Sequence, residues 1–154
     1  MFNFLGSLAS LVGLVLSISA FVFSKRALTA ARKAREAAMR QSLGEDMSSA
    51  ARMAGEIVMH LRLESNDTAL VRIGDLMNQA GYLNGRWEDR LSKKSRDNLL
   101  RALGQLRTMH EVLSAKRELA TDEKARLARS CQEVSEIFSA EQGVAIRATE
   151  AGDE

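Results

Sequence analysis

The sequence predicts an all-α protein in which an N-terminal transmembrane helix continues into a cytoplasmic bundle of about four helices. Three observations predict this class. Residues 2–23 hold neither a charge nor a proline, proline is absent from all 154 residues, and aromatic residues make up only 5% of the chain. A chain without proline that is rich in alanine, leucine, arginine and glutamate is typical of helical proteins.

The uncharged segment 2–23 has the length of a membrane span. At about 1.5 Å per residue, a helix of this length reaches roughly 33 Å, enough to cross a hydrocarbon core of about 30 Å. Lys25 and Arg26 follow directly. The positive-inside rule then predicts a single-pass inner-membrane protein with its N-terminus outside and its C-terminus in the cytoplasm. A cleaved signal peptide is the alternative, but its basic residues would precede the apolar run. We therefore expect a membrane helix over residues 1–24.

This segment also carries a seam of small residues whose spacing alternates between four and three. Such spacing keeps the residues on one face of a supercoiled helix, and small side chains let helix backbones approach closely. The seam predicts a homo-oligomer and does not distinguish a dimer from a tetramer. Two interpretations stay open: tight packing of identical helices, or a ring of helices around a narrow polar path. The seam comprises Gly6, Ser10, Gly13, Ser17, Ala20 and Ser24, continued by Ala27, Ala31, Ala34 and Ala38.

A basic extension, residues 25–41, follows the apolar segment. It lacks a helix breaker, so we expect one helix to run from Phe2 to Gln41. Anionic lipid headgroups explain the basic charge best; nucleic acid is the minor alternative, and no double-stranded nucleic acid partner is expected. Residues 25–40 have a net charge of +5, from Lys25, Arg26, Arg32, Lys33, Arg35 and Arg40 against Glu36.

The predicted bundle covers residues 42–140. A soft break at 42–44 precedes a helix whose apolar face includes Met47, Ala54 and Leu61. The second helix is expected to begin after an N-cap at Asp67 and to end at a C-cap glycine, Gly81. The Asn84-Gly85 pair indicates a loop between helices.

Two further amphipathic helices complete this prediction. The third begins at Ser92 or Ser95, and Thr121 caps the fourth. Helical periodicity fades after residue 140, which predicts an acidic flexible tail over 141–154. The expected buried positions of these helices are Leu99, Leu103, Leu106, His110 and Leu113, then Leu127, Cys131, Val134 and Phe138.

The chain offers little for catalysis. The only histidines, His60 and His110, and the only cysteine, Cys131, lie far apart in the sequence. A metal site needs several ligands at defined spacing, and a catalytic cysteine needs a neighbouring base. No glycine-rich phosphate loop is present. We therefore expect neither an enzyme nor a resident metal or cofactor.

A basic cluster around the only tryptophan is the best candidate for a ligand site. Basic groups beside an indole are suited to an anionic nucleotide or a single-stranded nucleic acid, which they hold by charge and stacking. The alternative is a solvated loop in which the tryptophan packs against one end of the bundle. The candidate contacts are Arg86, Trp87, Arg90, Lys93 and Lys94.

The layout of an uncharged segment 2–23, a small-residue seam and a helical remainder resembles the small single-pass membrane effectors of bacterial antiphage (abortive infection) defence. That resemblance implies a homo-oligomeric pore-forming or ion-channel effector that perturbs the membrane on a cytoplasmic signal. Ser10, Ser17 and Ser24 would then face the path. The alternative function is a membrane-anchored helical adaptor or scaffold that recruits a cytoplasmic partner. The expected partners are a second copy of the chain, membrane lipids, and an unidentified nucleotide or protein regulator.

Overall fold

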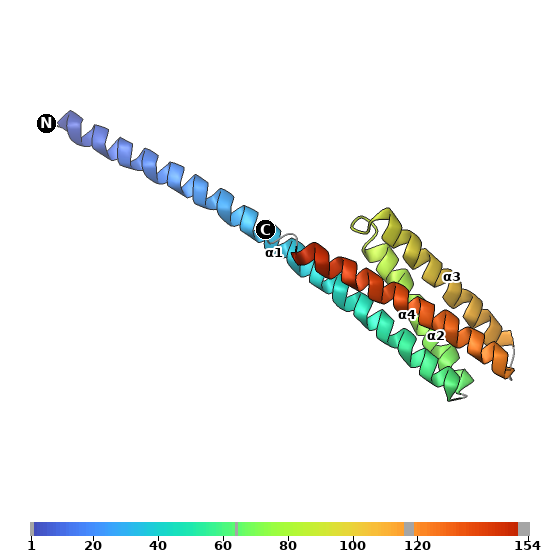
Figure 1. The fold of residues 1–154 in the computed structure, drawn as a ribbon. Helices are drawn as coiled ribbons and strands as arrows, with labels where there is room; N and C mark the ends of the chain where they lie inside the picture. Colours follow the sequence, from blue (N-terminus) through green and yellow to red (C-terminus); the bar gives the residue numbers. More distant parts are fainter. Residues whose placement is uncertain (1, 64, 116–118, 151–154) are drawn as a thin grey trace. The chain divides into compact units, whose positions relative to one another are not determined.

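The computed structural model describes the backbone of residues 2–63, 65–115 and 119–150, and their side chains except those of 2–12, 15 and 148–150. These residues form α1 (Phe2–Arg62), α2 (Asn66–Arg86), α3 (Lys93–Ala115) and α4 (Thr121–Glu150) (Figure 1). The all-α prediction is confirmed for this part of the chain. The chain divides into two compact units, residues 1–39 and residues 40–154, with α1 extending through both.

The predictions of a transmembrane helix and of an inner-membrane location are wrong. Over the described residues, none of the helices has both the length and the apolar character needed to cross a membrane.

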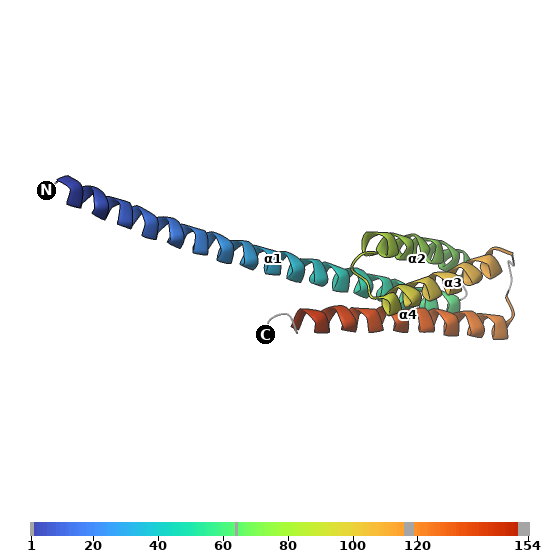
Figure 2. The ribbon, with the colours of Figure 1, turned by 90° about the horizontal axis from the view of Figure 1, so that it is seen from above.

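Residues 40–150 form an antiparallel bundle from the end of α1 together with α2, α3 and α4. Each helix runs opposite to the one before it, and connections of a few residues join them (Figures 1 and 2). Short connections of this kind favour antiparallel neighbours. All four helices contribute to one apolar core. Its largest fully buried side chains are Phe138, Met47, Ile57, Leu61, Ile73, Leu76, Leu83, Leu99, Leu106 and Met109.

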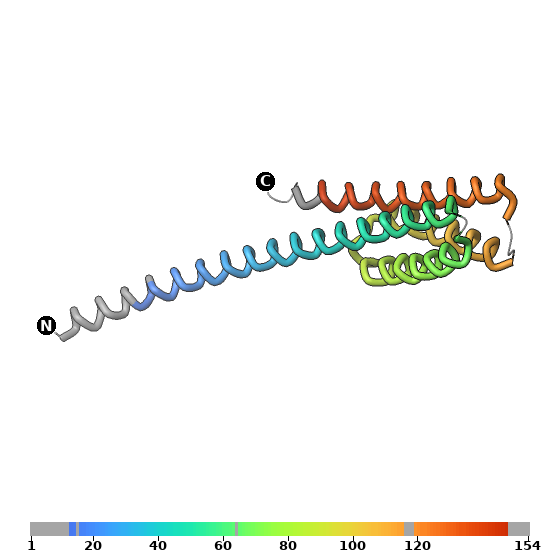
Figure 3. The backbone as a smooth tube through the Cα atoms, turned by 90° about the horizontal axis from the view of Figure 1, so that it is seen from below, coloured from blue at the N-terminus to red at the C-terminus, as the bar shows by residue number. Residues whose placement is uncertain are grey.

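Small residues bring α1 and α4 together. The Cys131 thiol donates to the Ala54 carbonyl at 3.2 Å, and the Ser135 hydroxyl donates to the Ala51 carbonyl at 3.1 Å. Side chains this short reach a neighbouring backbone only where two helices pack closely. The two helices accordingly lie side by side through this part of the bundle (Figure 3).

Glycines that were expected to interrupt helices lie inside them. α1 continues through Gly44, where an added Cβ would stand 4.0 Å from both Ala145 and Ile146 of α4. α2 passes Gly81 and ends at Arg86, so the predicted C-cap is wrong. Glycine costs about 1 kcal/mol in a helix interior, which the packing of the flanking apolar residues outweighs.

The start of α3 follows the predicted capping chemistry, whereas the predicted cap of α4, Thr121, is wrong. The Ser92 hydroxyl oxygen accepts a hydrogen bond from the Ser95 backbone N–H at 3.1 Å, which confirms Ser92 as the start signal of α3. At α4, the Glu123 carboxylate accepts from the Ala120 N–H at 3.2 Å. This is one half of a capping box, and it places the cap one residue before Thr121.

α4 extends well beyond residue 140. It remains helical to Glu150, and residues 151–154 of the expected tail lie outside the described residues. Glu141 and Ala145 are only 6% and 4% exposed. The Asn98 amide donates to the Glu141 carboxylate at 2.7 Å, so a residue assigned to the acidic tail helps to join α3 and α4.

Candidate functional site

The predicted small seam lies on an exposed face of α1. Gly13, Ser17, Ala20 and Ser24 are all exposed, whereas the side chains of Gly6 and Ser10 lie outside the described residues. The Ser17 hydroxyl donates to the Gly13 carbonyl at 2.8 Å. This hydroxyl is therefore already hydrogen-bonded within its own helix and needs no further polar partner.

Large apolar side chains flank the seam on both sides. If the small residues occupy the a and d positions of a heptad, Leu14, Phe21 and Leu28 occupy e, and Leu16 and Phe23 occupy g. Their exposed fractions lie between 54% and 69%. The seam and its flanks together form an apolar face, defined here as the α1 face, that runs from residue 13 to residue 38.

Charged residues of the same stretch avoid the α1 face. Lys25, Arg26, Arg32 and Lys33 fall at positions b and c of this heptad, and Glu36 falls at f. Only Arg35, at e, borders the seam, and residues 24–38 place no charge at a, d or g. The basic extension is thus amphipathic, with an alanine-rich strip opposite its charged side.

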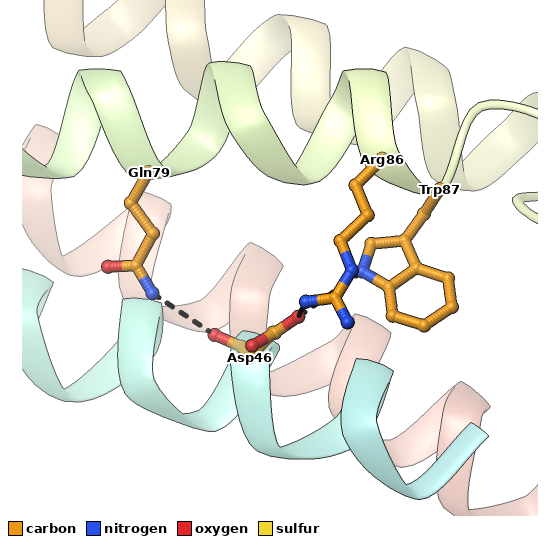
Figure 4. Close-up of polar contacts among 4 residues, drawn as sticks. All are labelled: Asp46, Gln79, Arg86 and Trp87. Atoms are coloured by element: carbon orange, nitrogen blue, oxygen red, sulfur yellow. Dashed lines mark hydrogen bonds and ion pairs between the residues drawn. The ribbon is translucent and has the colours of Figure 1, made fainter. Parts of the chain in front are cut away.

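A polar site joins α1 to α2 through Asp46 (Figure 4). One carboxylate oxygen of Asp46 accepts from an Arg86 guanidinium nitrogen at 3.2 Å and from the Trp87 indole N–H at 3.3 Å. The Gln79 amide also approaches the Asp46 backbone carbonyl at 3.5 Å. The Arg86 guanidinium lies 4.9 Å from the Trp87 ring centre, within cation–π range.

In this geometry the predicted ligand cluster separates into a buried part and an exposed part. Arg86 and Trp87 are brought together on Asp46, and Trp87 is only 5% exposed. Arg90, Lys93 and Lys94 are exposed, on the loop after α2 and the first turn of α3. The indole packs inside the bundle, which agrees with the packing alternative. Sequence reasoning missed Asp46 because it precedes Arg86 by 40 residues, and helical periodicity carries no information over that separation.

The single cysteine is held as a neutral thiol. Cys131 is fully buried, and burial raises its pKa from an ordinary value of 9.0 to about 12. Thiolate chemistry at neutral pH is therefore unfavourable at this position. His110 lies 3.4 Å from the Ser114 hydroxyl, on the same helix. Within the described ranges, no group of three or more His, Cys, Asp or Glu side chains is arranged to hold a metal ion.

Besides these sites, the described residues carry the α1 face and shallow grooves between the helices of the bundle. Comparisons with models of known protein families, with curated proteins and with solved structures found no match to this chain.

Proposed function

We propose that this protein is a self-associating helical adaptor. In this proposal the α1 face joins copies of the chain, and the bundle of residues 40–150 presents its outer surface to a partner protein. The observation that supports it is the continuous apolar α1 face, whose large side chains are more than half exposed in a single copy. Fully burying a Leu or Phe side chain contributes about 1.5–3 kcal/mol, so covering this face is strongly favourable.

A second copy of the chain is the occupant that suits the α1 face best. In a parallel, in-register pair, the apolar positions 14–23 of one copy meet the same positions of the other. Every basic side chain at b and c then points away from the partner helix. An antiparallel overlap along the whole face would instead set the basic extension beside Leu14 and Leu16. Parallel association is therefore the favoured arrangement.

The small residues at a and d determine how close the helices approach. Gly, Ala and Ser allow short backbone separation, and the larger residues at e and g then cover the partner's backbone. This division of roles accounts for a seam without large residues between two rows of Leu and Phe. A seam of this kind also continues without change into the basic extension, where Ala27, Ala31, Ala34 and Ala38 carry it.

Disulfide cross-linking of single introduced cysteines tests the proposal in the full chain. The native Cys131 is fully buried with a pKa of about 12, so introduced thiols are the ones that react. Ser17→Cys and Ser24→Cys place the thiol at a positions, and we expect covalent dimers under mild oxidation. Arg26→Cys and Lys33→Cys place it at c positions as matched controls, and we expect them to stay uncross-linked because facing Cα atoms would exceed about 7 Å.

A disrupting substitution completes the test. Ala27→Glu puts a carboxylate at a d position and should convert the oligomer to a monomer in light scattering after size exclusion. Lys33→Glu is the control: it changes the net charge by more than Ala27→Glu does, but at a c position outside the α1 face. It should leave the oligomer intact. Equal cross-linking at all four cysteine positions, or an oligomer that survives Ala27→Glu, would show that the α1 face does not join copies of the chain.

A further inference from the structure

One line of exposed residues runs along the outer side of α3. Its members recur at a spacing that alternates between four and three, which keeps them within about 40° of one line along the helix. The buried residues of α3, such as Ala102 and Leu106, lie on the opposite side. We call this line the α3 stripe. Its members are all exposed, and they are Lys93, Asp97, Leu100, Gly104, Arg107 and Glu111.

The charges of the α3 stripe complement the same stripe read backwards. From its start the order is positive, negative, leucine, glycine, positive, negative. If a second copy of α3 runs in the opposite direction, Lys93 meets Glu111 of that copy and Asp97 meets its Arg107. Each pair then occurs twice, because a two-fold axis relates the copies. None of these four charged side chains forms an ion pair within the part of the chain that the structure describes.

The middle of the α3 stripe is complementary in shape. Leu100 is 54% exposed, and a Cβ added at Gly104 would meet nothing within 4 Å. Glycine weakens a helix interior, and no described neighbour requires it at this position. In the antiparallel pair, Leu100 of one copy lies over Gly104 of the other. This contact accounts for an exposed leucine and a helix-weakening glycine at once.

We propose that the α3 stripe binds the α3 stripe of a second copy of this chain, antiparallel and centred on residue 102. A parallel pair would set every charge against its like. An antiparallel pair shifted by seven residues would set Leu100 against Asp97 or Glu111 of the other copy. The complementary charges therefore determine one orientation and one register.

Arg101 is the charged residue that flanks the stripe nearest the two-fold axis. In the proposed pair it lies near its own copy, which is a repulsive arrangement. Arg101 also lines a groove between α3 and α4 together with Glu133 and Glu136. These two carboxylates reduce the repulsion, because they bring negative charge to the side of Arg101 that faces away from the stripe.

This surface goes beyond the proposed function and does not rest on it, because every residue of the α3 stripe belongs to residues 40–154. Exposed ion pairs contribute little, so we expect a dissociation constant on the order of 1 mM for the contact alone. The Ala27→Glu chain should therefore still elute as a monomer after dilution on a column. If copies also pair through the α1 face, each pair carries two stripes and can join further pairs.

Cross-linking with a zero-length carbodiimide tests the contact in the full chain. This reagent joins an amine to a carboxylate that touches it, and the product is an amide. Lys93 and Glu111 are 18 residues apart on one helix, roughly 27 Å, so an amide between them must join two copies. We expect mass spectrometry to find this link in both the native and the Ala27→Glu chains. Lys94 is the internal control: it is exposed but off the stripe, and it should link to Glu111 at least about tenfold less.

A charge swap distinguishes the proposed pairing from a loss of folding. Asp97→Arg and Arg107→Asp each set like charges against one another, and each should reduce the Lys93–Glu111 link at least about tenfold. An equimolar mixture of the two variants should restore the link, because each supplies the charge that the other lacks. Asp75→Arg and Arg72→Asp are the charge-matched controls on α2, and they should change the yield by less than about twofold.

Three results would overturn the proposal. The first is a Lys93–Glu111 link no more abundant than the Lys94–Glu111 link. The second is a mixture of the two variants that fails to regain the link, and the third is an equal loss in the α2 controls. The α1 face is tested separately: cysteine cross-linking at Ser17 or Ser24 without the Lys93–Glu111 amide, or the reverse, shows which of the two surfaces fails.

Discussion

Removing the Asp46 carboxylate should destabilise the bundle mainly through the tryptophan. Trp87 is 5% exposed, so Asp46→Ala leaves its indole N–H buried without a partner. An unsatisfied buried donor costs about 1–3 kcal/mol, and the 3.3 Å separation favours the lower half of that range. The Arg86 ion pair adds little, since the Arg86 side chain is 42% exposed and solvent screens it. We expect a total loss of about 1–2 kcal/mol in the free energy of unfolding.

Urea denaturation followed by circular dichroism at 222 nm measures this loss. Double-mutant cycles then divide it between the two partners of Asp46. The cycle of Asp46→Ala with Trp87→Phe should give a coupling of about 1 kcal/mol or more, and the cycle with Arg86→Gln should give less than about 0.5 kcal/mol. Asp46→Asn is the matched control, because its amide oxygen still accepts the indole hydrogen bond and should retain most of the stability.

The reasoning would be refuted by either of two results. A coupling with Arg86 that exceeds the coupling with Trp87 would mean that charge, rather than burial of the indole, determines the energy. An Asp46→Ala variant within about 0.3 kcal/mol of the native chain would mean that solvent satisfies the indole N–H after the substitution. In that case Trp87 would be more accessible than its exposed fraction indicates, and a ligand role for the indole would regain support.

The remaining predictions concern glycine and cysteine. Gly81→Ala should raise the free energy of unfolding by about 0.5–1 kcal/mol, because nothing lies within 4 Å of the added Cβ; a decrease in thermal denaturation would contradict this. Gly44→Leu should instead lower the melting temperature, since Ala145 and Ile146 already stand 4.0 Å from a Cβ there, and a variant as stable as the native chain would show that α1 and α4 separate easily. The raised pKa of Cys131 means that above its ordinary value of 9.0 the unfolded thiol loses its proton while the native thiol keeps it. Stability should therefore fall as pH rises from about 9 to about 12, with a contribution absent in Cys131→Ala, and identical pH profiles of the two proteins would contradict the buried neutral thiol.

Several features of the fold follow from local patterns in the sequence. Leu127, Cys131, Val134 and Phe138 repeat at helical spacing, and all four are buried on one face of α4. The hydroxyl of Ser92 caps α3 as its position before an amphipathic run predicts. Patterns of this kind are reliable because they depend on interactions within one helix turn or on one helix face.

Predictions that depended on isolated residues were less successful. A glycine alone indicated a helix end at Gly81 and contributed to the expected break at Gly44, yet both lie within helices. The length of the uncharged segment 2–23 predicted a membrane span that the described residues do not support. For the two glycines, a local preference of about 1 kcal/mol was used without knowledge of what packs nearby.

The sequence by itself determined the helical class, the amphipathic faces of α3 and α4, and the small-residue seam of the α1 face. Only the tertiary structure decided that Asp46 holds Trp87 and that Glu141 bonds to Asn98. The reason is separation along the chain. Helical periodicity gives information about residues a few positions apart, whereas these contacts join residues 40 or more positions apart. Which of these residues meet is determined by how the helices pack against one another.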